Sequence, residues 1–365
     1  MKQKSLIGAV SGSADIRPTW VEVDLDAVRN NAVALAKLTS ADIYAVVKAD
    51  AYGHGAIQVA KALSGEVASF AVSLVEEGIE LREAGITDPI LVMGPAMAGG
   101  YSSLADYDMT AMISRVHDLE QLAELTQPVT FHLKVDTGMA RLGFSPAEAA
   151  PYVDRAAGLA THFASADSDD PADPESPTNR QLARFNKFLA DVDPDHRCVH
   201  HAANSGAILN YPAARFDAVR PGIALYGNID GPVRQALRFC TRIAQLRDVA
   251  AGTSVSYGGL WTAASASRLA VVPVGYADGY PRSLTGKAEV LVAGQRCPVV
   301  GAISMDMSLV DVTSLGDAAA VGDLVVLLGD QGDETISVVE FAERAGILPY
   351  EVTCGISKRV PRQYT

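Results

Sequence analysis

Cysteine is scarce in this sequence, and the cysteines that occur stand far apart. The 365 residues contain four of them, Cys198, Cys240, Cys297 and Cys354, with no Cys-x-x-Cys pair. A disulfide framework is typical of much shorter secreted chains, and a thiolate zinc site needs closely spaced cysteines. We therefore expect free thiols in a reducing compartment, and a cytoplasmic protein.

Long apolar runs are also missing. Near the N-terminus, Lys2 and Lys4 are followed only by the short apolar run 6–10, which is shorter than the core of a signal peptide. No stretch approaches the roughly 18 apolar residues of a membrane span. We therefore predict no membrane segment, and we expect residues 1–16 to form a flexible tail.

Positive charge is in deficit. Lysine and arginine number 30 against 43 aspartates and glutamates, which gives a formal net charge of −13. Nucleic acids and anionic membranes are bound by basic surfaces, so neither is an expected partner. The net negative charge does not exclude the binding of a small anion in a pocket that is locally positive. Hydrophobic residues make up 48% of the chain, which is enough for a full core.

From residue 43 onward, short apolar runs alternate with helix-like stretches. The runs carry few charges, as strands buried on both faces do, and fall at 43–48, 69–75, 89–94, 109–114, 129–136, 158–164, 198–205 and 218–226. Helices are predicted at 26–38, 56–63, 76–84, 117–125, 146–157 and 178–192. This alternation predicts an α/β fold, a closed (β/α)8 barrel of the TIM type. The alternative is an open doubly wound sheet, although the first turn lacks a Gly-x-Gly-x-x-Gly fingerprint.

After about residue 240 the pattern changes to short β-like runs separated by Gly, Pro and Asp. They fall at 254–257, 269–274, 289–292, 298–300, 308–312 and 324–328, and only 337–345 looks helical. This pattern predicts an all-β domain, either a barrel or a sandwich. We therefore expect a barrel domain over 17–240 and a C-terminal β domain over 241–365. The strand-like run 19–24 is a candidate to pair with the β domain.

Polar residues stand at the ends of the predicted barrel strands. They are Lys48, the run 134–141, His162, the group His201, Asn204 and Ser205, and the run 220–222. In a (β/α)8 barrel the C-terminal strand ends carry the active site. One such residue would mean little, but polar groups at so many strand ends are hard to explain as packing. The sequence therefore predicts a site at this end of the barrel.

Lys48 by itself supports two interpretations. A lysine that ends an apolar strand is often a surface residue whose charged end reaches water. The following Tyr52-Gly53-His54-Gly55 favours a second interpretation, because glycines let the backbone approach an anion and Tyr52 adds a hydroxyl donor. A lysine beside such a turn suits an aldehyde cofactor that carries a phosphate.

The late strand ends favour a phosphate site. Barrel phosphate sites are often built there from loop amides and hydroxyls, which 204–206 and 220–223 can supply. The alternative for Arg220 is an ion pair with a nearby acid. His200 and His201 are of the ligand type that metals use, but no third ligand stands at a convincing spacing, so we expect no metal.

These runs resemble the signatures of the alanine racemase family, enzymes of fold type III that depend on pyridoxal phosphate. The resemblance rests on 45–55 (AVVKADAYGHG), 134–141, 201–205, 220–222, 255–258, 275–279, 305–306 and 359–362. The motifs follow the family's order and cover the chain from about Trp20 to its end.

The resemblance implies roles for named residues. Lys48 would bind pyridoxal 5'-phosphate through a Schiff base and act as one acid/base, and Tyr257 of the partner subunit in a homodimer would be the other. The implied cofactor-binding residues are Lys48, Tyr52, His162, Asn204, Ser205, Arg220 (at the pyridine nitrogen), Gly222, Ile223 and Lys358. Substrate contacts are implied for Arg141, Tyr276, Met305 and Asp306, and a carbamylated side chain for Lys134. The implied product is D-alanine for cell-wall peptidoglycan.

Racemisation removes a proton from one face of a carbon and delivers one to the other, so two acid/base groups are natural. Free lysine and tyrosine have pKa values near 10, so both need neighbours that ease proton transfer near pH 7. His162 and Arg220 are the candidate neighbours of Tyr257. An arginine at the pyridine nitrogen stays charged, and that nitrogen then stays unprotonated.

One position departs from the family pattern. Well-known members carry a tyrosine where this chain has Lys358. Lys358 either supplies charge to the phosphate or points outward and leaves a roomier pocket, so serine or another small amino acid is an open alternative to alanine.

Two other functions compete. A fold-related decarboxylase of basic amino acids would place a cysteine and an acidic loop opposite the lysine, and the Val-Ser-Tyr-Gly run at 255–258 argues against it. A non-catalytic pyridoxal-phosphate binding protein would lack the second domain, which is present here.

Overall fold

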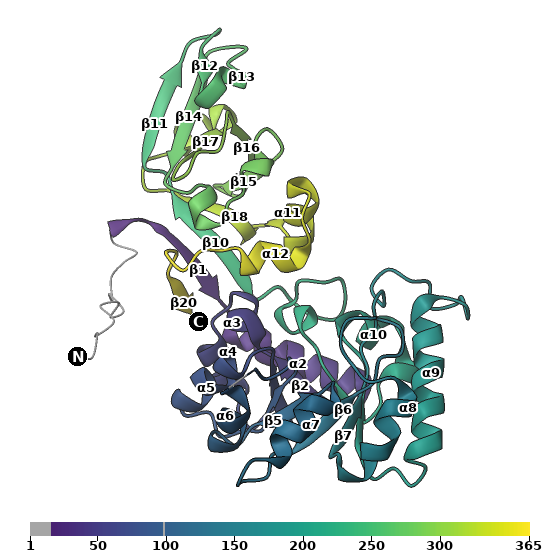
Figure 1. Cartoon of the computed structure of the whole chain (residues 1–365). Helices are drawn as coiled ribbons and strands as arrows, with labels where there is room; N and C mark the ends of the chain where they lie inside the picture. Colours follow the sequence, from purple (N-terminus) through teal and green to yellow (C-terminus); the bar gives the residue numbers. More distant parts are fainter. Residues whose placement is uncertain (1–15, 98) are drawn as a thin grey trace, which may run out of the picture. The chain divides into compact units, whose positions relative to one another are not determined.

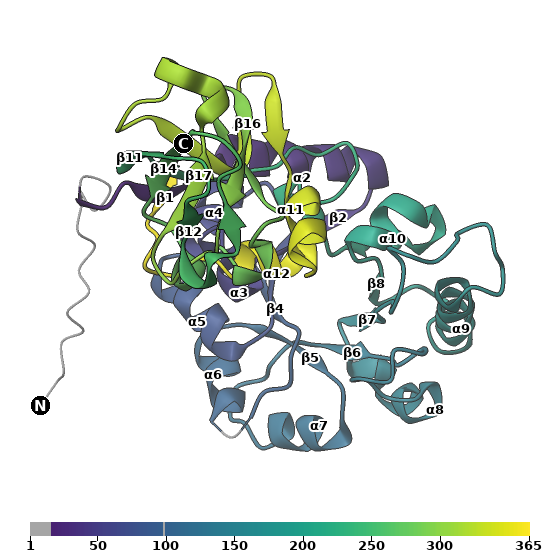
Figure 2. The ribbon, with the colours of Figure 1, turned by 90° about the horizontal axis from the view of Figure 1, so that it is seen from above.

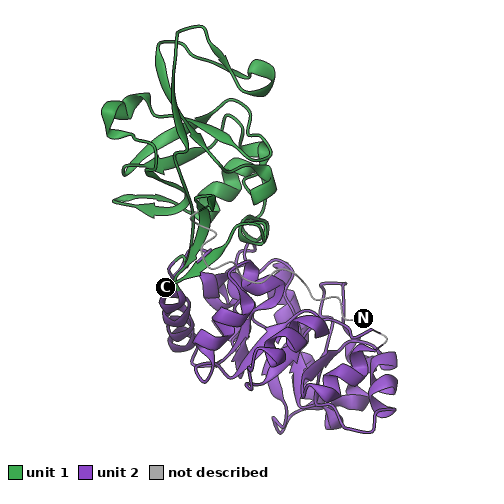
Figure 3. Cartoon of the chain, turned by 90° about the vertical axis from the view of Figure 1, so that its left-hand side faces the viewer, with its two compact units in different colours: residues 1–24, 235–365 green, residues 25–234 purple. Residues whose placement is uncertain are grey.

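The computed structural model describes residues 16–97 and 99–365, so the tail expected over 1–16 lies almost wholly outside the described residues. The chain divides into two compact units, Leu25–Arg234 and a second one that joins residues up to Asp24 to Gln235–Thr365 (Figure 3). The barrel unit ends earlier than the expected boundary at 240, because Leu237–Arg242 is a strand of the second unit.

The barrel unit contains a closed ring of eight parallel strands within the described residues. They are β2 (Asp42–Val46), β3 (Ser69–Val72), β4 (Ile90–Val92), β5 (Thr110–Ile113), β6 (Phe131–Lys134), β7 (Gly158–Ala160), β8 (Val199–His201) and β9 (Ala218–Val219). The last strand pairs with the first, Ile43 opposite Val219, which closes the ring. The predicted (β/α)8 barrel is therefore confirmed, and the open sheet was the wrong alternative.

Helices cover the outside of the ring (Figures 1 and 2). They are α2 (Leu25–Thr39), α4 (Ala56–Leu63), α5 (Val75–Glu83), α6 (Gly100–Asp106), α7 (Val116–Ala123), α8 (Pro146–Ala149), α9 (Pro177–Val192) and α10 (Ser205–Asn210), with the 3-10 turns η1 (Ala150–Arg155), η2 (Pro212–Ala214) and η3 (Ile223–Tyr226). Ser145 and Ser176 cap α8 and α9, each followed by a proline in the first turn. Among the described residues, no helix is long and apolar enough to cross a membrane.

The second unit is built on a mostly antiparallel sheet in the order β11–β14–β17–β16–β15–β18–β10–β1–β20, with β19 on β18. Its strands are β1 (Thr19–Val23), β10 (Leu237–Arg242), β11 (Gln245–Val249), β14 (Ser267–Val272), β15 (Glu289–Val292), β16 (Gln295–Val300), β17 (Ser308–Asp311), β18 (Leu324–Gln331), β19 (Glu334–Ile336) and β20 (Arg362–Tyr364). A separate hairpin joins β12 (Ser254–Val255) to β13 (Trp261–Thr262). The predicted β domain is thus confirmed.

Strand β1 lies between β10, which is antiparallel to it, and β20, which is parallel. The run 19–24 therefore pairs with the β domain. Two helices, α11 (Val338–Ala345) and α12 (Pro349–Cys354), and the 3-10 turns η4 (Tyr257–Gly259), η5 (Tyr276–Asp278), η6 (Arg282–Leu284) and η7 (Thr313–Ala318) complete the unit. Only α11 was predicted, because α12 is too short to show a helical period.

Candidate active site

Lys48 opens a left-handed turn. The first strand ends at Val46 instead of Lys48, and Ala49, Asp50, Ala51 and Tyr52 all have φ between 51° and 54°. This conformation costs L-residues about 1–2 kcal/mol each. One tertiary and one local bond offset the cost: the Ala49 amide donates to Glu77 Oε1 (2.6 Å), and the Ala56 amide donates to Asp50 Oδ1 (2.8 Å). A turn held at this cost fixes the direction of the lysine that begins it.

Several of the predicted strand-end residues of the barrel line one cavity of about 250 Å³, whereas His201, Asn204 and Ser205 are not among its lining residues. Its lining includes Lys48, Lys134, Arg141, His162 and Arg220, which come from the ends of four different strands, β2, β6, β7 and β9. Lys48 is half-buried and Arg220 is buried. The barrel thus brings separate polar groups to one place, as its topology predicts.

Arg220 is the most strongly held of these groups. Its Nη2 donates to the carbonyls of Thr161 (2.7 Å) and Ala202 (2.9 Å), and its Nη1 lies 2.6 Å from His201 Nδ1. Burial lowers the pKa of Arg220 to about 10, so the guanidinium is still protonated at neutral pH. A fixed positive charge therefore stands in the wall of the cavity.

The histidines around Arg220 are neutral. Burial, and then the charge of Arg220, lower the pKa values of His162 and His201 well below 6.5. Because Arg220 donates to His201 Nδ1, the proton of that ring belongs on Nε2, which lies 2.8 Å from His132 Nδ1. The chain Arg220–His201–His132 thus fixes one tautomer of each ring.

Sequence reasoning missed His132 and Thr161. His132 alternates with Lys134 along β6, and the two-residue period of a strand puts both on the same face, so the signal was present. Burial lowers the pKa of His132 to about 4. Thr161, just after β7, contributes the carbonyl that binds Arg220, which no pattern of side chains reveals.

Lys134 is a buried amine among cations. Burial, and then the charges of Arg220 and Arg141, lower its pKa to about 8. Asp136 counters this effect only weakly, because its carboxylate accepts from the amides of Gly138 and Met139. Among the described residues, no carboxylate is hydrogen-bonded to Lys134. Within the described part of the chain, the nearest carboxylate, that of Asp136, is thus engaged by backbone amides and not by Lys134.

Donors for a phosphate lie together at the late strand ends. Ser205 Oγ accepts from the amides of Gly222 (3.0 Å) and Ala224 (3.1 Å), and Ile223 between them is buried. A Cβ on Gly222 would stand 2.4 Å from the hydroxyl of Tyr52, so only glycine lets this loop and Tyr52 approach so closely. Asn204 instead caps α10 by accepting from the Ala207 amide at 3.0 Å. The donor set fits a phosphate-bearing cofactor.

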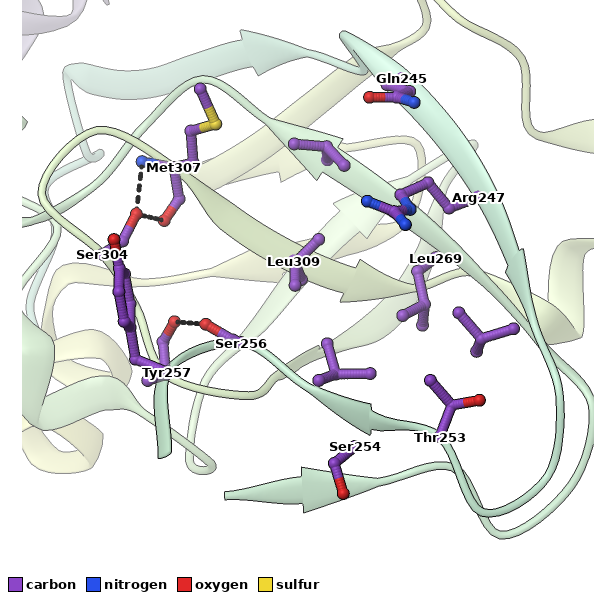
Figure 4. Close-up of a pocket in the computed structure, with 14 residues that line it drawn as sticks. Gln245, Arg247, Thr253, Ser254, Ser256, Tyr257, Leu269, Ser304, Met307 and Leu309 are labelled. Carbon is purple, nitrogen blue, oxygen red and sulfur yellow. Dashed lines mark hydrogen bonds between the residues drawn. The ribbon is translucent and has the colours of Figure 1, made fainter. Parts of the chain in front are cut away.

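In the second unit, Tyr257 lies on an exposed surface. It follows Ser256, whose φ is 65° and whose Oγ donates to the Ala302 carbonyl at 2.7 Å. Its side chain is 73% exposed, and Figure 4 shows it beside Ser304 at the edge of an open cavity of about 530 Å³. A neighbouring cavity of about 770 Å³ is lined by Tyr257, Tyr276 and Met305. Three predicted residues of this domain thus share one cavity.

The other two predicted residues of this unit lie at its surface. Lys358 is exposed. Asp306 Oδ1 accepts from Arg359 Nη2 at 2.6 Å, so its carboxylate is engaged by a side chain of the same unit.

Outside the cavity, His196, His200 and Asp217 place potential metal ligands within 4.8 Å of one another. Their nitrogens already have carboxylate partners: His196 Nε2 lies 2.9 Å from Asp217 Oδ1, and His200 Nε2 lies 2.9 Å from Asp193 Oδ2. The cluster is therefore satisfied by internal hydrogen bonds.

Fold and site together define a class of protein, a barrel enzyme whose polar groups surround a lysine at the carboxyl ends of the strands. Two family models match in succession: the alanine racemase N-terminal domain over residues 23–230 and the alanine racemase C-terminal domain over residues 236–364. The chain belongs to the alanine racemase family, as the sequence motifs predicted.

Relatives extend over nearly the whole chain. A protein of Halothermothrix orenii named alanine racemase is 41% identical over 95% of this chain and 97% of its own length. One of Symbiobacterium thermophilum with the same name is 42% identical over 96% and 97%. The solved alanine racemase of Streptomyces coelicolor A3(2) aligns with a TM-score of 0.89 and 33% identity over 97% of this chain and 99% of that one.

Proposed function

We propose that this protein is a pyridoxal-phosphate-dependent racemase that interconverts L- and D-alanine with two acid/base groups, Lys48 and Tyr257 of the partner subunit. The observation that carries the proposal is the buried, protonated Arg220, with neutral histidines around it, in the cavity that Lys48 lines. Family membership supports the same reaction.

The residues present fit the cofactor. Bound pyridoxal phosphate supplies the electron-withdrawing ring that weakens the Cα–H bond of an amino acid. Tyr52, Ser205 and the amides of Gly222 and Ile223 would hold its phosphate, with the Gly222 amide giving up its present bond to Ser205 Oγ. His162 would lie against the ring. Arg220 would donate to the pyridine nitrogen, and a nitrogen that accepts from a permanent cation has no proton of its own.

Lys48 and Tyr257 would each hold and move one proton, on opposite faces of the substrate Cα. They lie in different units of the chain, and the exposure of Tyr257 supports a role for it in a homodimer. Tyr276, Met305 and Met307 are also exposed, by 42%, 52% and 55%, and they surround the same open surface. Apolar surface of this kind usually contacts a partner. In a homodimer each active site would receive Tyr257 of the partner subunit.

Arg141 would bind the substrate carboxylate directly. Lys134 would act on that carboxylate indirectly, through Arg141. A carbamate on the Lys134 amine, whose pKa is lowered to about 8, would supply an anion beside Arg141 and hold Arg141 in place. Met305, Tyr276 and Asp306 would complete the substrate contacts. Lys358, in place of the usual tyrosine, leaves serine as a second substrate to test. The reaction in the cytoplasm would supply D-alanine for peptidoglycan.

The test is a racemisation screen over L-amino acids with the cofactor-loaded protein, followed by polarimetry. We expect the optical rotation of L-alanine to decay to zero without release of carbon dioxide. Carbon dioxide release would identify a decarboxylase, and unchanged rotation with cofactor bound would identify a binding protein.

The variant Tyr257→Phe separates the two acid/base groups. We expect it to retain the cofactor absorbance and to lose most α-proton exchange with L-alanine in heavy water, because only the phenol is removed. Unimpaired exchange in this variant would contradict the role of Tyr257. The variant Tyr364→Phe, at the exposed C-terminal strand, is the matched control and should exchange normally.

A further inference from the structure

Two loops of the β domain carry residues of the Tyr257 cavity, and backbone bonds join them directly. The amides of Tyr276 and Ala277 donate to the carbonyls of Ser304 (3.1 Å) and Met305 (3.0 Å). A Cβ on Gly275 would stand 2.2 Å from the Ser304 carbonyl oxygen, so the two loops are in close contact. The positions of Tyr276 and Met305 therefore depend on each other.

A fully buried carboxylate anchors the first loop. Asp278 is 0% exposed, and its Oδ2 accepts from the Gly275 amide at 3.0 Å. Its Oδ1 accepts from Arg17 Nη1 and from Arg359 Nε, each at 2.6 Å. Burial by itself raises the pKa of Asp278, but hydrogen bonds from Arg359 and Arg17 outweigh it and keep the pKa below its usual value. The carboxylate is thus ionised and has two arginine partners.

The two arginines differ in one respect. Arg359 extends its Nη2 to both Asp278 Oδ2 (3.2 Å) and Asp306 Oδ1 (2.6 Å), and so connects the two loops. Arg17 reaches Asp278 and the carbonyl of Arg359, and no bond joins it to Asp306 among the described residues. Of the two arginines, Arg359 alone therefore adds a side-chain bridge to the backbone bonds between the loop of Tyr276 and the loop of Met305.

We propose that Arg359 is a positioning residue, which sets the spacing between Tyr276 and Met305 by bridging Asp278 and Asp306. The inference rests on the proposed racemase function, in which this cavity receives substrate. Arg359 acts through the two carboxylates. Because its bond to Asp306 is largely exposed (side chains 41% and 55%), the bridge contributes little to stability and its effect falls on geometry.

The test compares Arg359→Lys with Arg17→Lys in the cofactor-loaded dimer. A lysine keeps a positive charge beside the buried carboxylate, but it lacks the planar fork that binds two acceptors at once. We expect Arg359→Lys to raise KM for L-alanine about tenfold with kcat within about threefold of the parent, since it loosens substrate binding alone. Arg17→Lys should leave KM within about twofold. An unchanged KM in Arg359→Lys, or an equal rise in both variants, would overturn the inference.

The variant Asp306→Asn provides a second test, because it removes the carboxylate that Arg359 binds at the other end of the bridge. The double variant Arg359→Lys/Asp306→Asn should raise KM no more than the larger single effect, whereas additive effects would contradict a shared bridge. Amide hydrogen exchange in the peptide 275–280 should accelerate in Arg359→Lys more than in Arg17→Lys, and equal rates would also contradict the bridge. Hydrogen exchange does not depend on catalytic turnover. If the parent protein had no racemase activity, the proposed function would be wrong, but the exchange measurement would still test the Arg359 bridge.

Discussion

The hydroxyl oxygen of Tyr52 lies 2.4 Å from the point that a Cβ atom would occupy on Gly222. Both residues belong to the proposed phosphate site. The φ of Gly222 is −108°, outside the left-handed region, and the Tyr52 hydroxyl is the nearest group that a larger residue there would meet. We predict that Gly222→Ala displaces the Tyr52 hydroxyl and weakens pyridoxal phosphate binding about tenfold or more, as titration of the apo-protein by absorbance would measure.

Gly99→Ala is the matched control, because nothing lies within 4 Å of its Cβ position and its φ is −68°. It should bind the cofactor as the parent does. Equal cofactor affinity in Gly222→Ala and Gly99→Ala would show that Tyr52 does not hold the phosphate.

The fold was largely predictable, because buried parallel strands and amphipathic helices differ in length and period. Helix α4 was predicted to the residue, Ala56–Leu63. The left-handed turn after Val47 was not predicted, since alanine, at Ala49 and Ala51, has no local preference for positive φ. That conformation comes from tertiary bonds such as the one between the Ala49 amide and Glu77, which a local pattern does not contain.

The candidate site was predictable where a side chain stands at the end of a strand, as Lys134 does, or just after it, as Lys48 and Arg220 do. It was less predictable where a backbone atom makes the contact, as the Thr161 carbonyl does. The bridge by Arg359 could not be foreseen either, because its two acceptors, Asp278 and Asp306, are distant in sequence from it.

Buried neutral histidines predict a loss of stability in acid. The pKa of His132 is lowered to about 4 in the folded protein, against about 6.5 in the unfolded chain. Below pH 6.5, His132 therefore binds a proton in the unfolded chain but stays neutral in the folded protein. Stability is therefore complete above about pH 6.5 and falls as the pH drops toward about 4. Between about pH 7.5 and pH 5.5 we expect each such histidine to cost about 1 kcal/mol of unfolding free energy.

Urea unfolding at the two pH values measures this loss. His132→Gln should reduce the difference in unfolding free energy between the two pH values by the contribution of one histidine, about 1 kcal/mol, whatever its effect on stability at neutral pH. His117→Gln, which changes an exposed histidine, should leave the difference unchanged. The same difference in His132→Gln and the parent would mean that His132 titrates normally in the folded state.

Lys134 should react with carbon dioxide. A carbamate forms when a neutral amine nitrogen bonds to the carbon of carbon dioxide and releases a proton, and the lowered pKa, about 8, makes a neutral amine available near physiological pH. We expect the label from ¹³C-bicarbonate to appear at one lysine by NMR, and to decline as the pH falls below about 8 because the amine is then protonated.

Lys134→Ala should raise KM for L-alanine, because Arg141 loses its anionic neighbour, and acetate should restore part of the loss. Lys187→Ala, at an exposed lysine paired with Asp191, should keep the labelled carbamate. Retention of the label in Lys134→Ala would place the carbamate elsewhere.

Lys48→Ala tests the anchor of the whole site. Removing the amine should abolish the near-visible absorbance of lysine-bound pyridoxal phosphate together with racemisation, since the proposed function gives this one group both roles, attachment point and acid/base. Lys61→Ala, on the exposed side of α4, should retain the absorbance and the activity. Borohydride reduction of the parent followed by peptide mapping should place the cofactor on the peptide that contains Lys48. A reduced cofactor on any other lysine would refute this assignment, and the roles given to Tyr52, Ser205 and Arg220 would then have to be argued around a different anchor.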